Sequence, residues 1–134
     1  MIVATITELE VIAIVERGVP NKESIAIKAK ESVNLGQYGI MLGTYSHSNA
    51  AFPFQDILFW FGDGLVENGD WIFVNTGEGR ATSSKTFDQQ HNVYSLFWGK
   101  RTTVFANSHV VPILFRVDAV HVLSPPTNLP QIGR

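Results

Sequence analysis

One stretch of the chain, residues 62–79, restricts the fold more than any other. It reads GDGLVENGDWIFVNTGEG, in which two glycine-rich turns bracket the short run Trp71–Asn75. The pair Asn68-Gly69 is typical of a tight turn, because these residue types tolerate the positive φ that such turns need. A five-residue run rich in β-branched and aromatic residues, closed by turns at both ends, predicts a strand and leaves no room for a helix. We therefore expect the rest of the chain to pack as strands against this one.

Short apolar segments separated by turn residues recur along the whole sequence. Segments of alternating or apolar residues, each ended by glycine, proline or polar residues, predict strands at residues 6–15, 23–29, 38–42, 71–75, 93–98, 110–117 and 119–123. Shorter pieces lie at residues 33–35, 52–54 and 104–105, and Pro53 indicates an edge strand. Residues 57–61 fit either a buried strand or one helical turn. Residues 44–51 and 80–92 are predicted to be polar loops. Short strands at such spacing indicate an all-β sandwich or barrel.

Length and composition indicate a single packed domain. The chain has 134 residues, of which 45% are hydrophobic and only 16% are charged, so material for a core is ample. We expect residues 1–123 to form this domain and residues 124–134, with three prolines, to form a surface tail. The absence of cysteine excludes disulfides, thiolate zinc sites and cysteine nucleophiles.

Charge and hydropathy bear on the classes of partner. No stretch approaches about 20 uninterrupted apolar residues, so no membrane span is predicted. Glu8 and Glu10 interrupt the first apolar run and no basic residue precedes it, so no secretory signal is predicted and a cytoplasmic location is the default. The net charge is −2 with no basic block, which argues against nucleic-acid binding.

The histidines and acids give only a weak indication of a metal site. His47 and His91 fall in the two predicted polar loops, and Asp63 or another nearby acid would complete a zinc site of a small metal-dependent hydrolase. No two histidines have the short spacing common in metal sites, no G-x-S-x-G motif is present, and the acids near the turns do not match an EF-hand. Exposed loop histidines are the favoured interpretation, and we expect no catalytic residue and no cofactor.

The aromatic residues crowd the middle of the chain. Side chains alternate between the faces of a strand, so Trp60 and its flanking phenylalanines cannot share one core. Either the tryptophans fill a two-layer sandwich, or some face a partner. The binding candidates on the second hypothesis are Trp60, Trp71, Tyr94 and Trp98. Carbohydrate binding by exposed tryptophans is an alternative to protein binding.

Several segments, in order, resemble a known family. They are Glu23-Ser24-Ile25-Ala26-Ile27-Lys28 followed by Val33-Asn34-Leu35-Gly36-Gln37-Tyr38, then residues 65–74 (LVENGDWIFV), then residues 94–99 (YSLFWG) and residues 104–107 (VFAN). Their order and spacing are similar to those of the lamin-tail domain. The sequence departs from that pattern at Ser108-His109-Val110 and at Tyr38, where the family more often has tryptophan.

The resemblance carries expectations about fold and function. It implies an immunoglobulin-like β-sandwich that serves as a binding and attachment module without catalytic residues. The hypothesis from the sequence is therefore a non-catalytic module that binds a protein partner or a second copy of itself.

Overall fold

The computed structural model describes residues 4–46 and 51–127, and within them the chain is almost entirely β-structure. One short 3-10 helix, η1 (Leu35–Gln37), begins after Asn34, whose side-chain oxygen accepts a hydrogen bond from the Gly36 N–H at 2.8 Å. The strands are β1 (Leu9–Val15), β2 (Ser24–Ala29), β3 (Val33–Asn34), β4 (Tyr38–Tyr45), β5 (Ala51–Trp60), β6 (Leu65–Val66), β7 (Trp71–Asn75), β8 (Thr82–Lys85), β9 (Asn92–Phe97) and β10 (Val110–Arg116).

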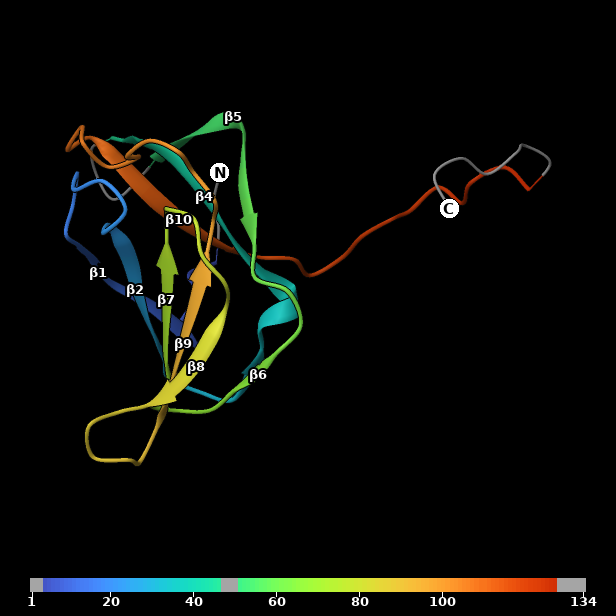
Figure 1. Cartoon of the computed structure of the whole chain (residues 1–134). Helices are drawn as coiled ribbons and strands as arrows, with labels where there is room; N and C mark the ends of the chain where they lie inside the picture. Colours follow the sequence, from blue (N-terminus) through green and yellow to red (C-terminus); the bar gives the residue numbers. More distant parts are fainter. Residues whose placement is uncertain (1–3, 47–50, 128–134) are drawn as a thin grey trace.

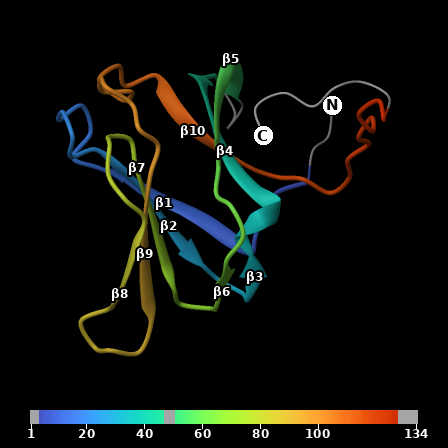
Figure 2. The same cartoon turned by 45° about the vertical axis from the view of Figure 1, so that its right-hand side comes forward.

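The strands form two main sheets and a small ribbon (Figures 1 and 2). One sheet has the order β1-β2-β7-β9-β8, the other has the order β10-β4-β5, and β3 pairs with β6. The pairs are antiparallel except β7 and β9, which run parallel from Trp71 opposite Val93 to Asn75 opposite Phe97. The predicted all-β sandwich is therefore confirmed.

The core lies between the inner faces of the two main sheets. Because side chains alternate along a strand, β2 and β7 direct their isoleucines and valines inward, while β4 directs Tyr38, Ile40 and Leu42 to meet them. Phe61 and Phe105, which lie outside these strands, belong to the same core. The core places the opposite face of each sheet at the molecular surface.

The turn before β7 forms as its sequence predicts. Gly69 has a φ of 95°, and the Asp70 N–H donates to the Glu67 carbonyl at 2.9 Å. The nearly buried Asp70 side chain accepts from the Glu67 and Asn92 N–H groups, both at 2.9 Å, so the turn also holds the start of β9.

Four sequence predictions about strands need correction. Residues 52–54 and 57–61 belong mainly to one strand, β5, and the helical alternative for residues 57–61 is wrong. The predicted loop at residues 80–92 contains β8, which pairs with β9. Residues 104–105 form no strand, because Glu23 binds their N–H groups instead. Of the predicted loop at residues 44–51, Thr44 and Tyr45 belong to β4 and Ala51 belongs to β5, while residues 47–50 lie outside the described part of the chain.

The predicted strand at residues 119–123 is also absent, and this changes the shape of the molecule. Residues 118–127, the C-terminal arm, are all exposed and run away from the sheets (Figures 1 and 2). The last backbone contact before it is the Val117 N–H, which donates to the Gln37 carbonyl at 2.8 Å. Alternating apolar residues alone do not make a strand here, because no neighbouring strand pairs with them.

None of the described helical structure is long and apolar enough to cross a membrane.

Candidate functional site

The four predicted binding aromatics do not form one surface. Tyr94 and Trp98 pack against the core, with the Trp98 ring 5.5 Å from that of Phe59. Trp60 lies on the outer face of the β10-β4-β5 sheet, and Trp71 lies on the outer face of the other sheet. The sandwich therefore separates the two outward-facing tryptophans and uses the other two aromatics for packing.

The three candidate metal ligands are not brought together in the part of the chain that the structure describes. His91 lies against Gly69 and Trp71, while Asp63 lies beside Gly36 near the small ribbon. His47 is outside the described residues. No cluster of three histidine or acidic side chains able to hold a metal ion occurs among residues 4–46 and 51–127.

The outer face of the β10-β4-β5 sheet is apolar and largely uncovered. Met41 lies opposite both Leu58 and Ile113, and Gly39 lies opposite Trp60 and Phe115, so these side chains share one face. Leu58 is 53% exposed and Trp60 is 45% exposed. We call these five side chains, Met41, Leu58, Trp60, Ile113 and Phe115, the outer apolar face.

Two glycines allow this face to pack closely. Gly39 lies beneath the ring of Phe115, and Gly43 lies beneath the end of the Ile113 side chain, where a Cβ atom would collide. With Gly39 between them, the rings of Trp60 and Phe115 approach to 6.0 Å between centroids at 48°. The outer apolar face is thus a closely packed set of five aromatic and aliphatic side chains, none of which is charged.

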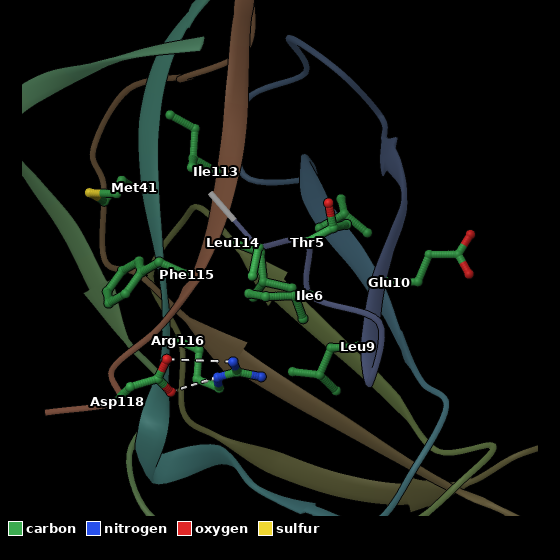
Figure 3. A pocket seen from close by; sticks show the side chains of 12 residues that line it. Thr5, Ile6, Leu9, Glu10, Met41, Ile113, Leu114, Phe115, Arg116 and Asp118 are labelled. Carbon is green, nitrogen blue, oxygen red and sulfur yellow. Dashed lines mark hydrogen bonds and ion pairs between the residues drawn. The ribbon is translucent and has the colours of Figure 1, made fainter. Parts of the chain in front are cut away.

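The outer apolar face continues into a groove of about 630 Å³ (Figure 3). Residues 4–6 and 9–11 form one wall, and Met41 with residues 113–116 and 118 form the other. The groove thus lies between β1 and β10, which are the end strands of their sheets on this side of the sandwich. Its lining is mainly aliphatic, with Ile6, Leu9 and Leu114 at its centre in Figure 3.

A cluster of charged groups closes one end of the groove. Arg116 Nε lies 2.7 Å from Asp118 Oδ1, and its guanidinium also pairs with Glu8 at 2.5 Å. The Tyr38 hydroxyl donates to the same Glu8 carboxylate at 2.5 Å. This donor, aided by Arg116, lowers the pKa of Glu8 to about 2, whereas burial and the nearby carboxylate raise the pKa of Tyr38 to about 12. These groups satisfy one another, so the groove offers apolar contact rather than a free acid or base.

A second hollow, of about 400 Å³, brings Trp71 and His91 together. Trp71 stacks on Phe73 with centroids 5.9 Å apart, and the Lys28 ammonium lies 5.4 Å from the Trp71 ring centroid. Asp88 stands at the rim of the hollow, where the Thr86 hydroxyl and the Gln90 N–H lower its pKa. An aromatic ring next to charged groups can hold a small polar ligand.

The sequence reasoning missed Met41, Leu58, Ile113 and Phe115. A usable signal was present, because β10 reads VVPILFR and has apolar residues at both parities. A strand of this kind at the edge of a two-layer sandwich buries one face and leaves the other apolar face in need of cover.

No protein-family model matches the sequence, and no curated protein matches it either.

Proposed function

We propose that this chain is a non-catalytic protein-binding module of the lamin-tail type, with the outer apolar face and the adjoining groove as its contact surface. The observation that carries the proposal is the exposure of Leu58 and Trp60 within a continuous apolar surface. Exposed apolar patches of this kind mark protein interfaces, and aromatic residues and methionine are enriched in them.

The resemblance to the lamin-tail domain supports the same function. The segments that carry it fall on elements of the fold: residues 23–28 cover most of β2, residues 33–38 cover β3 and η1, residues 65–74 cover β6 and most of β7, and residues 94–99 cover most of β9. A binding and attachment module needs a recognition surface but no reacting groups. The paired charges at the end of the groove agree with that requirement.

Site-specific photo-crosslinking tests this proposal. A benzophenone amino acid replaces Leu58, and in a matched control it replaces Thr82, an exposed residue on the other sheet. We expect adducts of discrete mass at position 58, either in the purified protein or in the cells that produce it, with no such adducts at position 82. Equal labelling at the two positions, or none at position 58, contradicts the proposal.

Carbohydrate binding at the Trp71 hollow is a second candidate, favoured by the aromatic ring beside Lys28, Asp88 and His91. Titration with a panel of glycans should change tryptophan fluorescence, and Trp71→Phe should abolish the change while Trp60→Phe retains it. Fluorescence that stays constant across the panel argues against this candidate.

A further inference from the structure

Within the C-terminal arm, residues 119–123 carry strongly exposed apolar side chains. Val120 and Val122 are each 77% exposed, and Leu123 is 88% exposed. Among the described residues, no hydrogen bond joins residues 119–123 to the rest of the chain. The segment Ala-Val-His-Val-Leu nevertheless has the alternation and β-branched content of a strand, and Pro125 and Pro126 end it sharply.

The edge of β10 offers a place for such a strand. Pro112 has no N–H to donate to β4, so the backbone groups of Pro112 and of the other even-numbered residues of β10 must point away from β4. The N–H of Val110, an even-numbered residue, indeed donates to the Asn107 carbonyl outside the sheet. The N–H of the odd-numbered Val117 donates instead to the Gln37 carbonyl, on the β4 side. By this alternation the backbone groups of Leu114 and Arg116 face the groove and can pair with an added strand.

The arm cannot readily return to its own β10. A hairpin from Arg116 to Ala119 would leave only Val117 and Asp118 in the loop, and two-residue hairpin loops favour residues at positive φ such as glycine and asparagine. Valine is among the residues least suited to that conformation. Neither residue has a positive φ in the structure, and the Val117–Gln37 bond and the Arg116–Asp118 pair hold both in the outgoing direction.

We infer that the groove between β1 and β10 receives residues 119–123 of a second copy of this chain. This inference rests on the proposed function, because the groove adjoins the outer apolar face. It identifies the protein partner as a second copy of the chain. Five residues span roughly 17 Å as a strand, which is shorter than the seven-residue β10 beside which they would lie. The exchange is reciprocal, so two arms fill two grooves in a closed dimer.

Sedimentation equilibrium of the full-length protein tests the inference. The variant Val120→Asp/Val122→Asp changes only exposed arm residues, and Ser124→Asp/Thr127→Asp adds the same charge to the arm outside the pairing segment. We expect the wild type and the control to form a dimer of twice 14.9 kDa. The first variant should dimerise at least tenfold more weakly.

A mixing experiment makes the test specific. The groove variant Ile113→Asp should be monomeric alone, but it should form a dimer with the arm variant, because its intact arm can enter the other chain's intact groove. A wild type that stays monomeric at all concentrations, or an arm variant that dimerises like the wild type, overturns the inference. In either case the adducts at position 58 still decide the proposed function separately.

Discussion

The carboxylate of Glu23 and the hydroxyl of Thr76 lie 2.9 Å apart in the interior, where the start of β2 meets the end of β7. Glu23 is 1% exposed and also accepts hydrogen bonds from the N–H groups of Gly18, Val104 and Phe105. One side chain thus joins the turn after β1, the five-stranded sheet and the irregular segment before β10.

Replacing this carboxylate should be costly. In Glu23→Gln, the amide nitrogen faces N–H donors and leaves at least one buried donor without an acceptor. We expect the free energy of unfolding to fall by about 2–4 kcal/mol, measured by urea denaturation. The exposed Glu31 provides the control, because Glu31→Gln should change stability by no more than about 0.5 kcal/mol. Equal effects of the two substitutions would show that the buried carboxylate is not a structural tie.

The Glu8–Tyr38 hydrogen bond should make stability depend on acid pH. The pKa of Glu8 is lowered from 4.5 to about 2 in the folded protein, so the unfolded chain takes up a proton first as pH falls. Stability from this bond is fully present above about pH 5 and is lost between about pH 5 and 2. In Tyr38→Phe the urea midpoint should decrease less steeply over that range, whereas Glu10→Gln should retain the wild-type slope. Parallel curves for all three proteins would contradict this assignment.

The outer apolar face should serve association rather than folding. Leu58→Lys places a charge at a position that is already 53% exposed, so we expect a stability change within about 0.5 kcal/mol. The same variant should lose the adducts formed by a crosslinker at position 113. Leu65→Lys, at a position 75% exposed in the small ribbon, is the matched control and should keep them. A large loss of stability in Leu58→Lys would indicate a structural role instead.

The turn at Gly69 should tolerate no side chain. Its φ of 95° is unfavourable for other residues, and an added methyl group would meet the His91 ring. We expect Gly69→Ala to lower stability by roughly 1–3 kcal/mol and to shift the His91 signals in an NMR spectrum. Gly64→Ala, where an added methyl group meets no atom within 4 Å, should do neither. Unchanged His91 signals in Gly69→Ala would show that the ring does not rest on this turn.

The sequence predicted those strands in which one buried face gives a regular pattern of apolar residues. β2, β4, β7, β9 and β10 appear where apolar periodicity and turn residues placed them, with ends that differ by a few residues. β8 was missed because all four of its residues, Thr-Ser-Ser-Lys, are exposed and carry no apolar period. Residues 119–123 were predicted as a strand because their apolar residues alternate, but a strand also needs an adjacent strand with which to form hydrogen bonds.

Long-range relationships account for the remainder. No local pattern in the sequence indicates that β7 pairs in parallel with β9. None indicates either that Glu23 binds the N–H groups of Val104 and Phe105, which follow it by more than 80 positions. The candidate site was only partly predicted: Trp60 was named, but its neighbours Phe115 and Ile113 come from a strand more than 50 residues away. Which aromatics face outward depends on strand order, and strand order depends on contacts that the sequence does not spell out.

The polar composition of β8 limits how far copies of this molecule can stack. β8 ends the five-stranded sheet with hydroxyls and a lysine, features that discourage another chain from continuing a sheet. The five-stranded sheet therefore cannot readily be extended by another strand at its β8 edge. A sheet that repels further strands at one edge can form complexes of fixed size without becoming a fibre.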